Sequence, residues 1–457
     1  MRLAAVLSVV VLASGCTSVA ERTPVPGATL EEAERPNILL VVTDDMRPDG
    51  LDAMPFTVRW LIRGGRTYTN AYATTPLCCP SRASIFTGRY AHNHGVLKNQ
   101  DSHDLDTSTT VQAYLGSEAS YRTGLVGKYL NSWSVEEDPP HFDRWASYSG
   151  RYYAKPFNID GTTTPTDSYS TYHMASRARA IMRAFEDNDD APWFLYVATV
   201  APHAPFTVAP QYKAAPVPVL HRGAEPAPSV AERDLSDKPD FPRRPFSLED
   251  PASLRRKTWR TLLSVDDLMR KLRSSLRRLD EERDTLVIFT SDQGLLQGEH
   301  GLFAKRLPYT EAIKVPLLLR WPDHIDQETD DRLVANIDIA PTILEVAGIE
   351  PDEPVDGRSL LADGERAELL IEQLENRRVG LPDWRSIRTS DFQFVEYYSR
   401  SGARVIAREY YNLQKDPWQL RNLLGDDDPS NDPYIDALAG RIEELRACTG
   451  SACVTLE

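Results

Sequence analysis

Three short runs of branched and aromatic apolar residues constrain the fold of this 457-residue chain more than any other feature. They span residues 37–43, 193–198 and 285–290. Continuous apolar runs of this length are typical of strands that are buried on both faces of a parallel sheet. Amphipathic helix candidates at 171–187 and 254–279 alternate with them. The pattern predicts an α/β fold with a large mixed, mostly parallel sheet flanked by helices.

The pattern changes beyond residue 365. Short alternating runs at 392–398 and 404–411 precede a helix candidate at 434–446. Such alternation is typical of antiparallel strands with one buried face. We therefore expect a main domain at 36–365 and a smaller C-terminal α+β domain, built on a short antiparallel sheet, at 366–457. The segment 205–251 is rich in proline and charge, and we interpret it as a surface excursion that shapes the entrance to a site.

The N-terminus has the pattern of an exported protein. A methionine and an arginine precede an apolar run at 3–13, which is too short to span a bilayer. The run ends in Leu-Ala-Ser-Gly-Cys, which resembles a bacterial lipobox in which Cys16 becomes the lipidated first residue. We predict a signal peptide at 1–15 and a lipid-anchored flexible tether at 16–35, and hence a lipoprotein at the cell surface. The alternative is an ordinary signal peptide with an incidental cysteine, and a secreted protein.

The charge balance excludes one class of partner. The chain has 52 basic and 67 acidic residues, a formal net charge of -15. Non-specific nucleic-acid binding needs a basic surface that neutralises phosphates, so no nucleic-acid partner is expected. An acidic protein that handles an anion must concentrate positive charge locally. No feature of the sequence indicates the oligomeric state.

Carboxylates directly follow two of the apolar runs. Asp44 and Asp45 follow the first, and Asp292 follows the third after one serine. The carboxyl ends of parallel strands meet at one edge of a sheet, so the three carboxylates are expected to face one crevice. Oxygen ligands of this kind suit Ca²⁺ or Mg²⁺. An isolated Asp-Asp pair is more often a turn or a helix cap.

The five cysteines of the chain fall into three groups. Cys16 belongs to the lipobox, and Cys448 and Cys453 can close a small disulfide loop in an oxidising compartment. Cys78 and Cys79 are adjacent, a geometry that rarely allows a bridge between the two.

Cys78 also lies next to a predicted helix. Pro80 suits the first helical position and Gly88 the end, so Cys78 is expected just ahead of the helix. Free N–H groups and the helix dipole favour an anion there, and Arg82 can direct its guanidinium to the same place. A thiol in that position would be unusually reactive. The alternative is a buried structural cysteine pair.

The sequence from Cys78 to Arg89, Cys-Cys-Pro-Ser-Arg-Ala-Ser-Ile-Phe-Thr-Gly-Arg, resembles the signature of type I sulfatases. The run that ends at Asp45 and the Thr-Ser-Asp-Gln-Gly around Asp292 are similar to the metal-binding strands of that family. The resemblance extends over nearly the whole chain, to the last cysteine. It implies an alkaline phosphatase/sulfatase-like fold whose main domain is a catalytic sulfatase domain that hydrolyses a sulfate ester.

By position, the resemblance implies the nucleophile. A formylglycine-generating enzyme would oxidise Cys78 to formylglycine, and Arg82 would stabilise the modified side chain. One hydroxyl of the hydrated aldehyde attacks sulfur, and the other expels sulfate by regenerating the aldehyde. One divalent cation, Ca²⁺ or alternatively Mg²⁺, would be bound by the residues Asp44, Asp45, modified Cys78, Asp292 and Gln293. Family members usually have Asn or His where Gln293 stands, so its role as a ligand is in question.

The resemblance also implies residues that bind sulfate and transfer protons. Lys128 and Lys305 match two active-site lysines, and His203, in Ala-Pro-His-Ala-Pro, matches a histidine that protonates the leaving alcohol. Many members have a second histidine where this chain has Leu130, which leaves the base for sulfate release open. His300 is a candidate for substrate binding, with a structural histidine as the alternative. The structural interpretation is favoured for two further histidines, His92 and His94.

Three motifs indicate a branch of the family. Gly-Lys-Tyr-Leu-Asn, Ala-Pro-His-Ala-Pro and Thr-Leu-Leu-Ser-Val-Asp-Asp look most like N-acetylglucosamine-6-sulfatases. They imply a sulfated sugar or glycan as substrate, with small aryl sulfates as another option. One alternative is a phosphonate monoester or phosphodiester hydrolase of the same superfamily. A second is a catalytically silent surface protein that binds glycans, against which the intact Cys-x-Pro-Ser-Arg motif argues, because a binding protein needs no oxidisable nucleophile.

Overall fold

The structure is a computed structural model that describes residues 35–454 except 154, 188–189, 219–226, 241–249, 304 and 376–379. The predicted signal peptide and all but the last residue of the predicted tether, Cys16 included, lie outside the described residues. Among the helices that the structure describes, none has the length and apolar character needed to cross a membrane.

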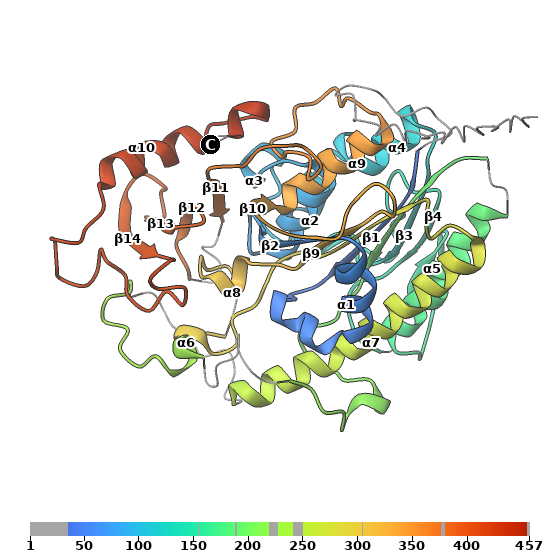
Figure 1. Ribbon diagram of the computed structural model, residues 1–457, viewed down its shortest axis with the longest axis horizontal. Helices are drawn as coiled ribbons and strands as arrows, with labels where there is room; N and C mark the ends of the chain where they lie inside the picture. Colours follow the sequence, from blue (N-terminus) through green and yellow to red (C-terminus); the bar gives the residue numbers. More distant parts are fainter. Residues whose placement is uncertain are drawn as a thin grey trace, which may run out of the picture.

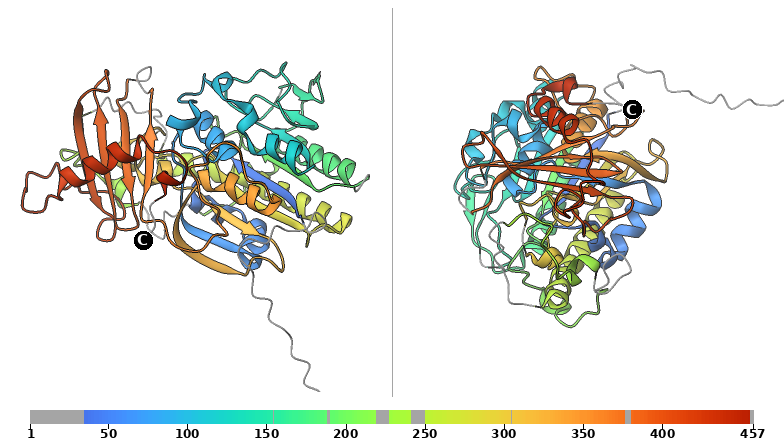
Figure 2. Two further views of the ribbon diagram at one scale, coloured as in Figure 1. Left: turned by 90° about the horizontal axis from the view of Figure 1, so that it is seen from above. Right: turned by 90° about the vertical axis from the view of Figure 1, so that its left-hand side faces the viewer.

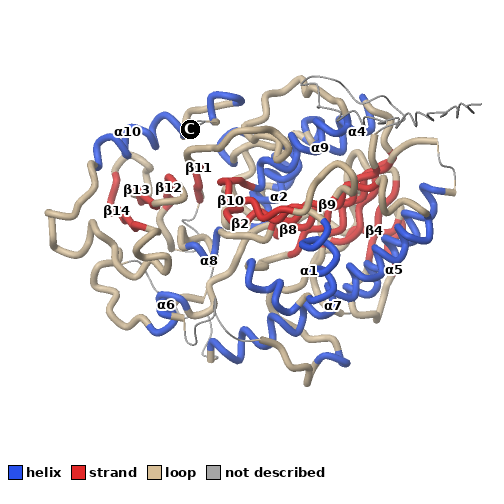
Figure 3. The backbone as a smooth tube through the Cα atoms, in the orientation of Figure 1, coloured by secondary structure: helices blue, strands red, loops and turns tan. Residues whose placement is uncertain are grey.

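A mixed sheet of ten strands forms the centre of the main domain (Figures 1 and 3). Its strands are β1 (Asn37–Thr43), β2 (Arg66–Tyr72), β3 (Arg122–Gly127), β4 (Arg144–Ser147), β5 (Phe157–Ile159), β6 (Thr162–Thr164), β7 (Trp193–Ala198), β8 (Thr285–Ser291), β9 (Leu317–Arg320) and β10 (Glu328–Ala335). They lie in the order β10-β2-β9-β8-β1-β7-β3-β4-β5-β6. The five strands from β8 to β4 are parallel, whereas β9, β5 and β6 pair antiparallel with their neighbours. The predicted fold class is confirmed.

Helices cover both faces of this sheet (Figures 1 and 2). The α-helices are α1 (Pro55–Leu61), α2 (Cys78–Thr87), α3 (Ala91–His94), α4 (Val111–Glu118), α5 (Ser170–Glu186), α6 (Pro228–Ala231), α7 (Pro251–Leu279), α8 (Thr310–Ile313), α9 (Ile339–Ala347) and α10 (Ile435–Leu445). Successive residues of a strand point to opposite faces, so β1 contributes to two cores. Leu39 and Val41 pack with α1, α5 and α7, and Leu40 and Val42 pack on the side of α2, α4 and α9.

Short 3₁₀ helices connect these elements. They are η2 (Pro48–Ala53), η3 (Ile62–Gly64), η4 (Ser102–Asp104), η5 (Thr107–Thr109), η6 (Pro210–Tyr212), η7 (Glu299–Gly301), η8 (Asn336–Asp338) and η10 (Gly450–Cys453).

A second, antiparallel sheet lies beside one end of the main sheet (Figure 2). It contains β11 (Leu369–Gln373), β12 (Asp383–Arg388), β13 (Phe392–Tyr398) and β14 (Val405–Asn412) in that order. Helix α10 packs on this sheet through Ile442 and Leu445. Cys448 and Cys453 form a disulfide, and the carbonyl of Cys448 accepts a hydrogen bond of 2.9 Å from Asn93 of α3. The expected small antiparallel sheet is therefore present, while the domain boundary after residue 365 stays a prediction.

Helix α2 begins slightly earlier than predicted. Cys78 is its first residue rather than the residue before it. Pro80 is then the third residue, where its missing N–H costs nothing because the first N–H groups of a helix have no partner within it. Gly88 ends the helix as predicted, with a φ of 69°.

Most described residues of segment 205–251 are exposed or half-buried, as expected of a surface excursion. It contains η6 and α6 and, among its described residues, no strand. The Lys238 side chain is 1% exposed, and its ammonium contacts Glu232 at 2.7 Å and the carbonyl of Leu420 at 2.8 Å. Lys238 therefore joins this surface segment to the C-terminal part of the chain, and the effect of the segment on substrate entry stays a prediction.

Candidate active site

The carboxyl ends of β1, β3, β7 and β8 meet at one edge of the main sheet, where α2 also begins. Asp44 and Asp45 follow β1, and Asp292 follows β8. Lys128 follows β3, and His203 lies five residues beyond β7. The sheet topology thus brings together predicted site residues that are up to about 250 positions apart in the chain.

Three carboxylates of the site are buried. Asp44 and Asp292 are fully buried and Asp45 is 3% exposed. Asp45 has a φ of 68°, which turns the chain sharply after β1, and its N–H donates to the Asp292 carboxylate at 3.1 Å. One possible ligand atom from each of Asp44, Asp45, Cys78 and His203 lies within 4.8 Å of the others.

Cys78 lies at the centre of these groups. Its Sγ is 2.7 Å from Nζ of Lys305, 3.3 Å from Nε2 of Gln293 and 3.6 Å from a carboxylate oxygen of Asp44. Burial raises the pKa of this thiol to about 11, although Lys128 and Lys305 oppose that shift. Burial therefore opposes the effect that the helix start and the nearby lysines have on this thiol, and its reactivity stays a prediction.

Arg82 is fully buried and faces the carboxylates. Its Nε and Nη2 both lie 2.9 Å from the Asp292 carboxylate, and Nη2 lies 3.4 Å from Asp44. Another guanidinium nitrogen donates to the hydroxyl of Tyr196 at 3.1 Å. Arg82 therefore compensates two buried negative charges and fixes their positions.

The two lysines approach the site from different elements. The ammonium of Lys128 pairs with Asp44, and that of Lys305 lies 2.7 Å from Asp45. Burial alone would lower the pKa of each lysine, but these carboxylates raise it, so both stay cationic at neutral pH. Burial alone would likewise raise the pKa of Asp44, yet Lys128 and other nearby cationic groups hold it well below its usual range.

His203 is the site residue most open to solvent. Its side chain is 34% exposed, whereas those of Lys128 and Lys305 are 9% and 15% exposed. Its Nε2 lies 3.6 Å from Asp45, and its Nδ1 lies 2.7 Å from the carbonyl of Ala204. The ring can therefore reach both the buried carboxylates and a group that enters from outside.

The residues at this edge fit a hard divalent cation. Three carboxylates supply oxygen ligands, and the buried Oε1 of Gln293 has no hydrogen-bond partner among the described residues. The Nε2 of the same amide donates to Asp45 and to Cys78. A 180° flip of the amide group would therefore bring its oxygen next to Asp45 and Cys78. The extra methylene of Gln293 therefore does not carry its amide out of the site.

The other candidate histidines lie in separate hydrogen-bonded environments. His300, 1% exposed, contacts Glu232 at 2.6 Å, and no hydrogen bond or ion pair among the described residues joins it to the Cys78 site. Its role in substrate binding stays a prediction. His92 contacts Glu372 of β11 at 2.8 Å, and His94 contacts Ser84 of α2 at 3.0 Å. These contacts favour the structural interpretation of both.

The sequence did not indicate several residues that support the site. The hydroxyl of Ser81 donates to the carbonyl of Asp292 and accepts from Asn336 at 2.9 Å. Tyr196, the partner of Arg82, belongs to the apolar run of β7 and had the pattern of a core residue. Leu130 is 4% exposed and packs in the core, so its position supplies no base.

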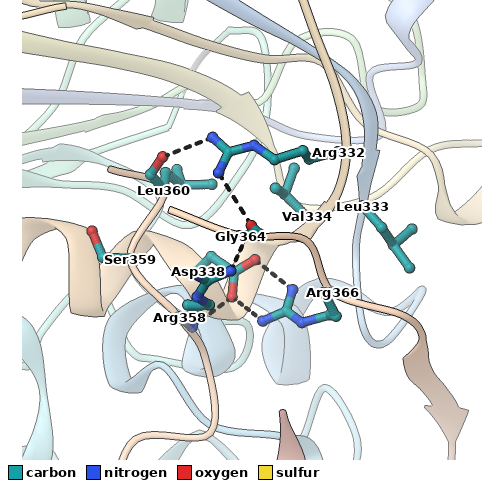
Figure 4. A pocket seen from close by; sticks show the side chains of 9 residues that line it. All are labelled: Arg332, Leu333, Val334, Asp338, Arg358, Ser359, Leu360, Gly364 and Arg366. Carbon is teal, nitrogen blue, oxygen red and sulfur yellow. Dashed lines mark hydrogen bonds and ion pairs between the residues drawn. The ribbon is translucent and has the colours of Figure 1, made fainter. Parts of the chain in front are cut away.

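A second charged cluster has a structural role (Figure 4). Arg366 forms a bidentate ion pair with Asp338, with N–O distances of 2.6 and 2.7 Å. The N–H of Arg358 donates to the same carboxylate, and Arg332 donates to carbonyls of Leu360 and Ala362. These contacts hold the segment after α9 against β10 and η8. The guanidinium groups of Arg332 and Arg366 thus bind other parts of the chain rather than a ligand.

Comparisons with known proteins agree with this geometry. The family model described as Sulfatase matches residues 36–349, and that described as N-sulphoglucosamine sulphohydrolase, C-terminal, matches residues 298–448. Human N-acetylglucosamine-6-sulfatase is 31% identical over 92% of this chain and 86% of its own length. N-acetylglucosamine-6-O-sulfatase of Bacteroides thetaiotaomicron is 26% identical over 86% and 84%.

Two solved structures share the fold. A protein solved with its substrate D-glucosamine-2-N,6-O-disulfate superposes with a TM-score of 0.74, at 24% identity over 90% of this chain and 97% of the other. A phosphonate monoester hydrolase from Silicibacter pomeroyi superposes with a TM-score of 0.71, at 22% identity over 91% and 96%. At these identities the likeness establishes the fold alone.

Proposed function

Because this chain belongs to the sulfatase family, we propose that it hydrolyses a sulfate ester on a sugar or glycan, with Cys78 as the source of the nucleophile. One observation supports the proposal above all others: the Sγ of Cys78 lies among Lys305, Gln293 and Asp44 at the carboxyl edge of the sheet. A sulfuric ester needs fixed positive charge around its oxygens and a nucleophile in line with sulfur. The contact of 2.7 Å between Lys305 and the Cys78 side chain supports the proposal, because it brings a fixed cation next to the source of the nucleophile.

The nucleophile requires maturation of the chain. A thiol with a raised pKa is a poor nucleophile at neutral pH, so we propose that a formylglycine-generating enzyme oxidises Cys78. The hydrated aldehyde supplies one hydroxyl that attacks sulfur and a second whose deprotonation releases sulfate. Lys128 and Lys305 neutralise charge on the sulfuryl oxygens, and the exposed ring of His203 donates a proton to the leaving alcohol.

A divalent cation would complete the charge balance. The residues that would hold it are Asp44, Asp45, Asp292, Gln293 and modified Cys78, and their oxygen ligands suit Ca²⁺ or Mg²⁺. When bound, such an ion polarises a sulfuryl oxygen and lowers the pKa of the attacking hydroxyl. Arg82 keeps Asp44 and Asp292 in place for it through the ion pairs described above.

The relatives suggest the class of ester. Two of them, human and bacterial, are N-acetylglucosamine-6-sulfatases, and the solved complex contains glucosamine disulfate. We therefore propose a 6-sulfated N-acetylglucosamine unit as substrate. A catalytically silent glycan-binding protein would have no use for a buried Cys78 between two lysines, so we do not favour that alternative.

Parallel assays test the reaction class. We expect kcat/KM for an N-acetylglucosamine 6-sulfate or an aryl sulfate to exceed that for a phosphonate monoester or phosphodiester by at least about 100-fold, or roughly 3 kcal/mol of transition-state binding. The phosphonate monoester hydrolase of similar fold makes the comparison necessary. Faster turnover of the phosphorus substrates would overturn the proposal in favour of that activity.

We further propose that the chain is exported and anchored through lipidated Cys16. Replacing Cys16 by serine removes the thiol that acylation requires, so the protein should move from the membrane fraction to the soluble fraction. Fractionation followed by immunodetection measures the shift, and the neighbouring substitution Ser14→Ala serves as a control that keeps the thiol. Recovery of both proteins in the soluble fraction would indicate an ordinary signal peptide.

A further inference from the structure

The longest helix concentrates positive charge that the proposed hydrolysis does not use. Helix α7 contains nine lysines and arginines and two aspartates, in a chain with a net charge of -15. The buried Asp266 accepts hydrogen bonds from the N–H and hydroxyl of Thr57, at 2.7 and 2.8 Å. Asp267 accepts from the hydroxyls of Tyr172 and Tyr212, at 3.3 and 2.6 Å. Both acids are thus engaged internally, and the outer face of α7 is basic.

Neighbouring helices hold some of these cations in position. Helix α7 lies between α1 and α5 on one face of the sheet (Figure 1). The guanidinium of Arg270 lies 4.9 Å from the ring of Phe56 in α1, and the ammonium of Lys271 lies 4.8 Å from the ring of Tyr172 in α5. Contacts of this kind fix the side chains while leaving the charge near solvent.

Several basic side chains of this layer have few or no acidic partners among the described residues. We call the following six the α7 patch, of which Arg277 alone has an acidic neighbour, Glu282 at 3.6 Å: Arg59, Arg63, Arg183, Lys271, Arg277 and Arg278. Five of the six are exposed and Lys271 is half-buried. Apart from the contact of Arg277 with Glu282, the patch therefore presents positive charge that no acidic side chain of the described residues pairs with.

The chain enters the fold next to this patch. Asn37, the first residue of β1, donates from its N–H to the carbonyl of Asp284 at 2.9 Å and from its side chain to Glu281 at 2.9 Å. Glu281 lies three residues beyond Arg278 and two beyond the end of α7. The predicted tether is thus attached at the amino edge of the sheet, beside the patch. The Cys78 site lies at the opposite, carboxyl edge.

We propose that the α7 patch rests on an anionic phospholipid bilayer when the chain is anchored through Cys16, with the active site directed away from the lipid. Lysines and arginines close to an anionic bilayer are attracted to it, and the attraction acts only within about a Debye length of roughly 8 Å. A tether of residues 16–34 reaches at most about 65 Å when extended, so it limits the distance of the patch from the bilayer, and the charge attraction acts when the patch comes within the Debye length. This placement does not depend on the chemistry of Cys78.

Vesicle binding tests the proposal on the full chain carrying Cys16→Ser, which has no acyl group of its own. We expect sedimentation with vesicles of phosphatidylglycerol and phosphatidylethanolamine, no sedimentation with phosphatidylcholine, and release by high salt. The triple variant K271Q/R277Q/R278Q should weaken partitioning about a hundredfold, or roughly fivefold for each charge removed. The triple variant R400Q/R404Q/K415Q removes three exposed charges from the second domain and should bind as the parent does.

Two other results would overturn the proposal. One is absence of binding to the anionic vesicles, or equal binding by both triple variants. The other is patch-dependent binding to heparin, used as a polysulfated probe, without binding to vesicles, which would assign the patch to a glycan. If the α7 variant melts at a lower temperature, R59Q/R63Q tests the same surface with an expected loss of about 25-fold. Sulfate release from a small soluble ester, measured on the same samples, reports separately on the proposed hydrolysis.

Discussion

Replacing Cys78 by alanine is expected to lower kcat/KM for a sulfate ester by on the order of 10⁵-fold, because no other side chain occupies the position of the nucleophile. The fold should persist, since the change removes one sulfur atom from a buried helix start at a cost of about 1–2 kcal/mol. Sulfate release and thermal melting of the same sample measure both effects. Loss of activity without loss of melting identifies a chemical role rather than a packing role.

Cys79 provides the matched control for this experiment. It is also fully buried in the first turn of α2, but its Sγ contacts the carbonyl of Asn131 at 3.8 Å rather than a charged group of the site. Cys79→Ala should keep activity within about tenfold of the parent. Mass spectrometry of the peptide that contains residue 78 should show the sulfur replaced by an aldehyde oxygen. An active enzyme with an unmodified Cys78, or an active Cys78→Ala variant, would contradict the proposed nucleophile.

The central strands could be predicted because their sequences allow few alternatives. The runs at 37–43 and 193–198 have the bounds of β1 and β7, and a continuous apolar run of this length must be buried on both sides. The outer strand β10 begins with Glu-Thr-Asp-Asp-Arg and has no such pattern. Its pairing with β2 depends on a partner more than 250 residues away, which local composition cannot indicate.

The positions of the candidate site could be predicted, but their electrostatics could not. Motif spacing placed Cys78 near a helix start, and the helix rule alone suggested an unusually reactive thiol. The fold buries the side chain completely, and desolvation then raises the pKa. Burial of one residue depends on every element that packs around it, so a local motif does not determine it.

The hydrogen-bond partners of the site residues also could not be predicted from the sequence. Arg82 bonds the hydroxyl of Tyr196, 114 residues away, and His300 bonds Glu232, 68 residues away. Neither partner belongs to a motif, and each has a common alternative role as a core aromatic or a surface acid. Only the packing of β7 against α2, and of α6 against η7, brings these pairs together.

Removal of the cation is expected to have the second-largest effect on activity. Asp292→Asn keeps the shape of the side chain beside Arg82 but removes one of three negative charges from the proposed ligand set. We expect sulfate release to fall by on the order of 10³-fold, because a bound ion contributes several kcal/mol to stabilising charge in the transition state. A chelator should do the same to the parent enzyme and lower its melting temperature, since an ion that binds only the folded state stabilises it.

Titration calorimetry with Ca²⁺ and Mg²⁺ distinguishes a ligand from a residue that merely packs nearby. After chelation, the parent should regain activity when the ion that it binds, Ca²⁺ or Mg²⁺, is returned. The Asp292→Asn variant should bind the same ion at least about 100-fold more weakly. Two variants of Gln293 form a matched pair. Gln293→Asn keeps an amide oxygen and should retain ion binding. Gln293→Leu removes the oxygen that has no hydrogen-bond partner among the described residues, and this variant should lose ion binding. Full activity in chelator, together with equal behaviour of the two Gln293 variants, would mean that the three carboxylates serve only to balance Arg82, Lys128 and Lys305.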